Sequence, residues 1–346
     1  MKKQIFFFFF LLITATAFTQ ARTKVSFNSN WKFFLGDDSL ASKIFYDDSK
    51  WRTLNLPHDW SIEGNFSEQH ATTYNQGALP AGTGWYRKTF TLPSTAKGKQ
   101  VYISFDGVYR NSEVWINGHT LGKRPYGYSS FQYDLTPFLR FGKEKNSIAV
   151  RVDNSAQPSS RWYTGSGIYR NVWLEMTNPV AVAHWGSFIS TPEVSETKAL
   201  ITVQTKITNA SGQPIWIHPV VEIYDAANRM VASGSSSKKI LINTDTTENS
   251  MSVPLNHPKL WSVDRPYLYK AVTKLLSNGK EIDRVETTFG IRSFSFDAAN
   301  GFFLNSKSLK ILGVCLHHDL GALGAAVNKR AIERQLEILK QMGANA

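Results

Sequence analysis

The stretch GVCLHHD, residues 313–319, places two histidines and an acid at the end of an apolar run. Imidazole and carboxylate groups can hydrogen-bond hydroxyls, exchange protons or bind a metal. A metal site is disfavoured, because adjacent side chains on a strand point apart and no third ligand is evident. By spacing alone, His317 and His318 are typical of histidines that satisfy backbone groups at a strand end.

The elements around this stretch indicate how it is positioned. Leu309–Leu316 is expected to be a buried strand, and apolar residues then recur at helical spacing between Asn328, a candidate N-cap, and Gly343, a candidate C-cap. Strand, polar loop and helix form the repeating unit of a TIM barrel, whose chemistry lies at the carboxyl ends of its strands. Only one such unit precedes Ala346, so the sequence is expected to be cut short within the barrel.

The composition is that of a globular protein with several domains. The chain has 346 residues, of which 42% are hydrophobic and 19% charged, and its formal net charge is +12. The basic residues are scattered among acids, which indicates a solvated basic surface and no nucleic-acid partner.

Residues 1–21 have the pattern of a secretory signal peptide. Two lysines precede the apolar run Ile5–Ile13, and small residues follow, with cleavage expected after Ala17 or Ala21. No later stretch is long and apolar enough to span a membrane. We therefore expect export to the periplasm or the extracellular space.

Two β-domains are expected between the leader and the barrel segment. Residues 22–178 alternate short strands with turns, as in a jelly-roll sandwich, and residues 179–298 have the size and strand texture of an immunoglobulin-like sandwich. Asn117-Gly118 and Asn278-Gly279 are strong hairpin signals. The third unit, residues 299–346, begins with a small hairpin. The fold class is thus multidomain and mainly β. The clearest expected strands are Tyr86–Leu92, Gln100–Phe105, Ser112–Ile116, Ser147–Val152, Asn171–Met176, Leu200–Ile207, Val220–Tyr224, Ser250–Leu255, Tyr267–Leu275 and Glu281–Thr288.

Several segments, in this order, resemble glycoside hydrolase family 2, particularly its secreted β-galactosidase-like members. They are LPHDW at 56–60, GTGWYRKTF at 82–90, the block 105–139, RWYTGSGIYRNVWLE at 161–175, FGIRSFSF at 289–296 and GVCLHHD. The resemblance implies a jelly-roll sugar-binding domain, an immunoglobulin-like domain and a TIM barrel with a retaining mechanism, in which one glutamate is the acid/base and another the nucleophile. In the family both glutamates lie beyond the first βα unit, so no catalytic residue is assigned in this chain.

The resemblance also implies which residues contact the sugar. His317 stands where the family presents a histidine to the substrate, Asp319 could bind a hydroxyl or orient an imidazole ring, and His318 is expected to be structural. Arg161 and Trp162 lie in a loop that the family extends toward the barrel mouth. Some members carry an acid at the position of Arg161, so the acidic contact does not carry over. Trp162 could stack on a sugar or pack between domains.

Two acids on the expected helix, Glu333 and Glu337, are interpreted as an exposed face with ordinary ion pairs, and Asp319 alone cannot support a double displacement.

No cofactor is identifiable, although a cation in the complete enzyme is compatible with the sequence, as is a homo-oligomer. We therefore expect the amino-terminal part of an exported exo-glycosidase acting on terminal β-galactosides, inactive alone. The family alternatives are β-glucuronidase and β-mannosidase. A non-catalytic carbohydrate-binding protein is the alternative from another class.

Overall fold

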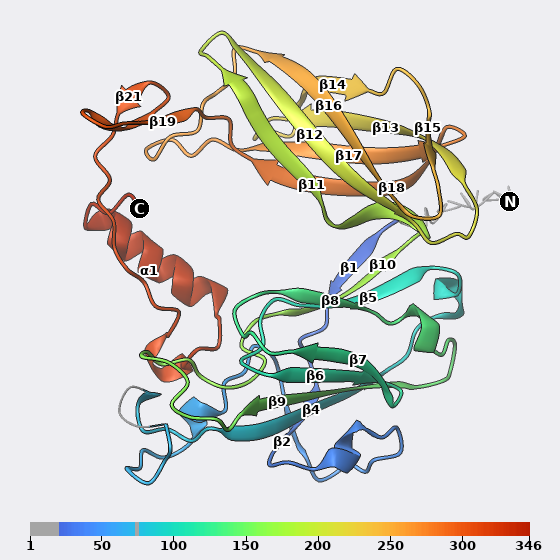
Figure 1. The fold of residues 1–346 in the computed structure, drawn as a ribbon, viewed down its shortest axis with the longest axis vertical. Helices are drawn as coiled ribbons and strands as arrows, with labels where there is room; N and C mark the ends of the chain where they lie inside the picture. The colour runs from blue at the N-terminus through green and yellow to red at the C-terminus, as the bar shows by residue number, and fades with distance from the viewer. Residues whose placement is uncertain (1–20, 73–75) are drawn as a thin grey trace, which may run out of the picture.

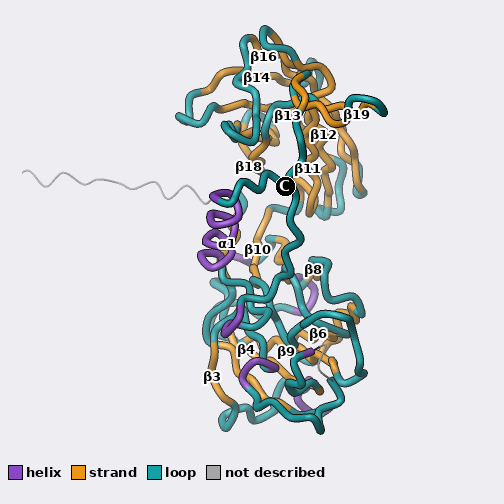
Figure 2. The backbone as a smooth tube through the Cα atoms, turned by 90° about the vertical axis from the view of Figure 1, so that its left-hand side faces the viewer, coloured by secondary structure: helices purple, strands orange, loops and turns teal. Residues whose placement is uncertain are grey.

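The computed structural model describes residues 21–72 and 76–346. Two β-sandwiches lie one above the other, and a third segment ending in helix α1 runs beside them (Figure 1). Figure 2 shows that the helix lies alongside the region between the sandwiches. All but the last residue of the expected signal peptide lies outside the described residues. No helix in the described ranges has the length and apolar character needed to cross a bilayer.

The first sandwich consists of a four-stranded and a six-stranded sheet that enclose an aromatic-rich core. The four-stranded sheet has the order β1-β10-β5-β8 and contains β1 (Thr23–Ser26), β10 (Val172–Thr177), β5 (Gln100–Phe105) and β8 (Phe131–Asp134). The six-stranded sheet has the order β3-β2-β4-β9-β6-β7 and contains β3 (Arg52–Leu54), β2 (Trp31–Leu35), β4 (Gly82–Phe90), β9 (Asn146–Asn154), β6 (Ser112–Ile116) and β7 (His119–Arg124). All strand pairs in both sheets are antiparallel.

Local chemistry explains several boundaries in this sandwich. Asn117 and Gly118 both adopt positive φ, which confirms the expected hairpin between β6 and β7. Along β6, buried residues alternate with half-buried ones, because alternate side chains of a strand face the core. Short 3-10 turns lie in the connections between strands, at Ser39–Ser42, Ser61–Glu63, Ser94–Ala96 and Thr136–Phe138.

The second sandwich packs a three-stranded sheet against a five-stranded one. The three-stranded sheet has the order β11-β12-β16 and contains β11 (Val180–Val194), β12 (Lys198–Asn209) and β16 (Thr246–Asn256). The other sheet has the order β14-β13-β17-β18, with β15 paired to β13, and contains β14 (Met230–Ser235), β13 (Ile215–Tyr224), β17 (Tyr269–Ser277), β18 (Lys280–Phe289) and β15 (Ile240–Ile242). Asn278 and Gly279 again adopt positive φ and form the expected β17–β18 hairpin.

The third segment begins with a small sheet and ends in one helix. The sheet contains β19 (Phe294–Asp297), β20 (Gly301–Leu304) and β21 (Lys307–Ser308), so the expected small hairpin is confirmed. Helix α1 (Lys329–Gln341) follows a 3-10 turn at Gly321–Leu323. The Asn328 side chain accepts a hydrogen bond from the Ala331 N–H, and Gly343 has a φ of 98°, so both expected caps are present.

The expectation of a buried strand at Leu309–Leu316 is wrong for this structure. These residues, all of them described, form no strand, and Ile311, Leu312 and Val314 are exposed. A strand is stable only when a neighbouring strand accepts and donates its backbone hydrogen bonds. Here the backbone partners are the last two residues, since the Asn345 N–H donates to the Leu312 carbonyl and the Val314 N–H donates to the carbonyl of the terminal alanine.

Candidate functional site

The loop between β9 and β10 carries Arg161 and Trp162 at one end of the first sandwich. Arg161 is exposed, and Trp162 is 40% exposed. The indole Nε1 of Trp162 donates to the Tyr128 hydroxyl at 3.0 Å. Burial, the largest cause, raises the pKa of Tyr128 to about 12, so this phenol is protonated at neutral pH. The hydrogen bond fixes the tryptophan ring while leaving part of it accessible to a ligand.

A buried glutamine holds the backbone of this loop. The Gln76 side-chain oxygen accepts hydrogen bonds from the N–H and the hydroxyl of Thr164, both at 3.0 Å. Its amide nitrogen donates to the Trp162 carbonyl. Gln76 and Thr164 are almost fully buried, so these bonds are shielded from competition with water. The loop is therefore preorganised.

Asp59, from the segment LPHDW, joins the loop to the third segment of the chain. One carboxylate oxygen accepts from the N–H groups of Ser61 and Ser166, at 3.0 and 2.8 Å. The other accepts from the Tyr163 hydroxyl at 2.6 Å and from the Ala325 N–H at 2.9 Å. Asp59 is only 2% exposed. Burial and the nearby Asp59 charge raise the pKa of Tyr163, which therefore acts as a donor.

Two glycines, Gly165 and Gly324, pack closely against the Asp59 carboxylate. A Cβ at Gly165 would come within 2.5 Å of the Asp59 carboxylate, and a Cβ at Gly324 within 2.4 Å. Both glycines also have positive φ, at 64° and 58°. Any larger residue at either position would push the two loops apart, so the close approach depends on glycine.

The histidines of GVCLHHD lie beside this junction. The His318 ring is half-buried against Tyr128 and Tyr169, with ring centroids 5.6 and 5.5 Å away. Burial lowers the pKa of His318, so its imidazole is neutral at pH 7. His317 is exposed, and its ring centroid lies 6.0 Å from that of Trp162. The structure thus separates a packed histidine from one that faces solvent beside the loop.

The five candidate site residues fall into two groups. His317, Trp162 and His318 lie in one cluster around Tyr128. Arg161 and Asp319 are exposed, and they adjoin Trp162 and His318, respectively, in the sequence. Their roles in substrate binding stay predictions. Within residues 21–72 and 76–346, no three His, Cys, Asp or Glu side chains are grouped to hold a metal ion.

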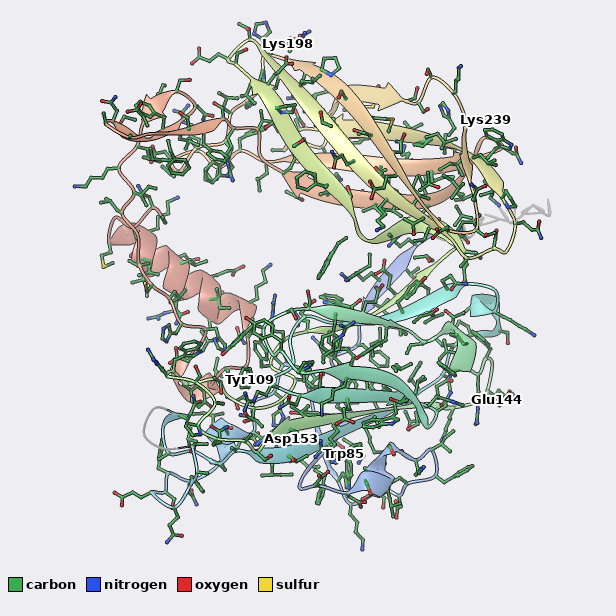
Figure 3. The ribbon with its side chains drawn as sticks, viewed as in Figure 1. Trp85, Tyr109, Glu144, Asp153, Lys198 and Lys239 are labelled. Atoms are coloured by element: carbon green, nitrogen blue, oxygen red, sulfur yellow. The ribbon has the colours of Figure 1, made fainter. Side chains whose placement is uncertain are left out.

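The residues that position this cluster were not predicted from the sequence. Asp59 lies in LPHDW, so that motif could have directed attention to it, but nothing local indicated that Gln76 or Tyr163 would hold the loop. Tyr109, labelled in Figure 3, lies at the same end of the first sandwich, and its ring centroid is 5.2 Å from that of Tyr128.

The acids Glu333 and Glu337 form exposed ion pairs with Arg330, as expected of a solvated helix face.

Comparison with known families assigns both sandwiches. Residues 25–179 match "Glycosyl hydrolases family 2, sugar binding domain", and residues 186–292 match "Glycosyl hydrolases family 2". The chain belongs to glycoside hydrolase family 2. As a family 2 protein it carries the sugar-binding domain and the immunoglobulin-like domain, as the sequence predicted.

Relatives in this family include galactosidases and glucuronidases. The chain is 48% identical over 332 residues to "Beta-galactosidase BoGH2A" from Bacteroides ovatus, with 96% of this chain and 39% of that protein covered. It is 42% identical to a "Putative beta-glucuronidase" from Formosa agariphila, with 94% and 30% covered. A crystal structure of a family 2 member from Bacteroides cellulosilyticus matches with a TM-score of 0.90 and 41% identity, covering 93% of this chain and 42% of that one. The chain thus spans about two fifths or less of the length of these relatives.

Proposed function

We propose that this chain is the sugar-binding and positioning part of a retaining exo-glycosidase that releases terminal β-linked galactose. The observation that supports this most directly is the junction at Asp59, because it ties the Trp162 loop to the segment that carries His317. The 48% identity to a β-galactosidase favours a galactoside as substrate. The 42% identity to a "Putative beta-glucuronidase" makes a glucuronide the second candidate.

Each exposed group of the cluster has a role in this proposal. The indole of Trp162 offers a partly accessible face against which the apolar face of a sugar ring can pack. The His317 imidazole can donate to or accept from ring hydroxyls, and such bonds accelerate catalysis if they tighten in the transition state. Arg161, the exposed neighbour of Trp162 in the sequence, adds a positive charge outside the cluster. The acid/base and the nucleophile are glutamates of the barrel, and we assign neither to a residue of this chain.

Export is part of the proposal. The pattern of residues 1–21 supports secretion, so we infer that the enzyme acts on glycans outside the cytoplasm. Expression in a bacterial host, followed by fractionation and amino-terminal sequencing, tests this point. A mature chain beginning at Phe18 or Arg22 is expected, whereas an intact Met1 in the cytoplasm would contradict it.

The test of the activity starts from the coding DNA beyond codon 346. The protein encoded there together with this chain is assayed with chromogenic β-galactoside and β-glucuronide. We expect galactoside cleavage, and we expect His317→Ala to lower kcat/KM by about tenfold, because one hydrogen bond to a sugar hydroxyl is lost. Cys315→Ser, an exposed position two residues away, is the matched control. Absence of barrel sequence, or a product inert toward both substrates, would reject the proposal.

A further inference from the structure

The second sandwich has a hollow of its own, separate from the loops around Trp162. It lies on the outer face of the three-stranded sheet and has a volume of about 340 Å³. Two aromatic rings and a set of polar side chains line it: Trp185, Phe188, Gln204, Lys206, Glu248 and Ser250. Polar groups converging around apolar rings in a concave surface are the usual composition of a small-ligand site.

A β-bulge creates the aromatic part of this hollow. The register of β11 against β12 shifts between Val182 and Ser187, and within this interval Trp185 has a φ of 52°. Gly186 lies so close to β12 that a Cβ there would come within 2.6 Å of the Lys206 carbonyl oxygen. Bulky residues rarely adopt positive φ, and bulges commonly redirect a side chain near a functional site. The strained backbone turns the indole outward, and Trp185 is 72% exposed.

The rings of Trp185 and Phe188 are exposed and can serve as stacking surfaces for a ligand. The His184 ring stacks on the Trp185 ring, with centroids 4.6 Å apart and an interplanar angle of 27°, which limits the orientations of the indole. Phe188, three residues further along β11, is 61% exposed. The face of an aromatic ring carries partial negative charge, and the C–H groups on one side of a pyranose carry partial positive charge, so the two attract. The apolar face of a sugar fits this surface.

The polar side chains that line the hollow can form hydrogen bonds, and together they carry no net charge. Lys206 on β12 pairs in register with Glu248 on β16, and Gln204 pairs with Ser250. One lysine and one glutamate are cross-strand neighbours on this face, so it favours neither an anion nor a cation, while its amide and hydroxyl groups can both donate and accept. Asn249 also borders the hollow, but it alternates with Glu248 and Ser250 along β16, so its side chain faces the opposite side of the sheet.

From this combination we propose that the hollow is a second glycan-binding site, which takes a pyranose ring of a neutral oligosaccharide with Trp185 as its stacking surface. Every described residue that lines this hollow belongs to the second sandwich.

The test is calorimetric titration of the 346-residue chain with neutral galacto-, gluco- and manno-oligosaccharides. Trp185→Gly removes the ring at a position where glycine adopts the observed φ freely, and it is expected to weaken binding by about tenfold or more. Trp185→Phe keeps an aromatic face and should retain part of the affinity. Trp216→Ala is the matched control, because Trp216 is also exposed, at 55%, but lies on β13 in the opposite sheet.

Further measurements separate the alternatives. Flat titrations of the wild-type chain with all three glycans, or unchanged binding by Trp185→Gly with a wild-type circular dichroism spectrum, would overturn the proposal. Binding lost in Trp162→Ala and kept in Trp185→Gly would assign the glycan to the loop near His317 and not to this hollow. Self-association in sedimentation that disappears in Trp185→Gly would show that the hollow is a contact between copies, which also overturns it.

Discussion

Buried carboxylates connect the three parts of this chain at two junctions, and their hydrogen-bond partners differ in kind. Asp283, at the junction of the two sandwiches, binds the Arg22 guanidinium through both oxygens, at 3.0 and 2.8 Å, and Glu175 binds the same guanidinium. Asp59, at the junction of the first sandwich with the third segment, accepts only from N–H groups and a phenol. A full charge compensates the first carboxylate, whereas dipoles compensate the second.

The difference predicts different consequences of mutation. Removing a counter-ion leaves a buried charge without compensation, and Asp283 is completely buried. Removing one of four dipolar donors weakens a network that can partly adjust. The junction between the sandwiches should therefore be the more sensitive one, and the junction at Asp59 should be able to loosen without unfolding the sandwich beneath it.

The largest effect is expected for Arg22→Met. This change leaves Asp283 and Glu175 buried near each other without a cation, and we expect it to lower the free energy of unfolding by about 3–5 kcal/mol. Urea denaturation measures the loss. Arg284→Met is the control, because Arg284 is more exposed and pairs with the exposed Glu286 on the surface. Equal unfolding free energies for Arg22→Met and the wild type would show that the charged junction does not fasten the sandwiches.

A smaller and local effect is expected for Asp59→Asn. The amide keeps one oxygen for the Ser61 and Ser166 N–H groups, but its nitrogen then faces the Ala325 N–H as a second donor. We expect a cost of about 1–3 kcal/mol, confined to the docking of the third segment. Hydrogen exchange at Ala325 should accelerate, while exchange in β5 stays unchanged. Asp319→Asn, at an exposed carboxylate, is the matched control, and slow exchange at Ala325 in Asp59→Asn would contradict the prediction.

The smallest effect concerns pH and arises next to Asp59. Burial lowers the pKa of His58, although the neighbouring Glu63 partly opposes this shift, and the His58 Nδ1 lies 2.7 Å from the Tyr86 hydroxyl. A histidine whose pKa is lower in the folded than in the unfolded state favours folding fully at pH values above its unfolded pKa, near 6.5. That contribution is lost as the pH falls from about 6.5 toward the folded pKa.

Unfolding free energies measured between about pH 8 and pH 5 check this prediction. The wild type should lose stability on acidification, and His58→Gln should lose less. His257→Gln, at an exposed histidine in the second sandwich, should follow the wild-type profile. Identical profiles for wild type and His58→Gln would mean that the segment 56–60 is not the pH-sensitive part of the fold.

Much of the fold followed from local sequence. Gln100–Phe105 and Ser112–Ile116 were predicted with the boundaries that β5 and β6 have, because alternating apolar residues bounded by turn signals define such strands. The two Asn-Gly turns and the caps of helix α1 were predicted for the same reason, since their conformations depend on a few adjacent residues. The family motifs added the order of the domains.

The positioning of the candidate site depended on contacts between distant parts of the chain. Asp59 and Ala325 are separated by 266 residues, and Arg22 and Asp283 by 261, so no local pattern could pair them. The strand expected at Leu309–Leu316 was wrong because a strand requires a neighbour, which an apolar run cannot supply for itself. Sequence alone was enough for the turns, caps and strands whose conformation depends on adjacent residues. The pairing of each buried carboxylate with its donors was visible only in the assembled fold, because those contacts form when distant segments are brought together.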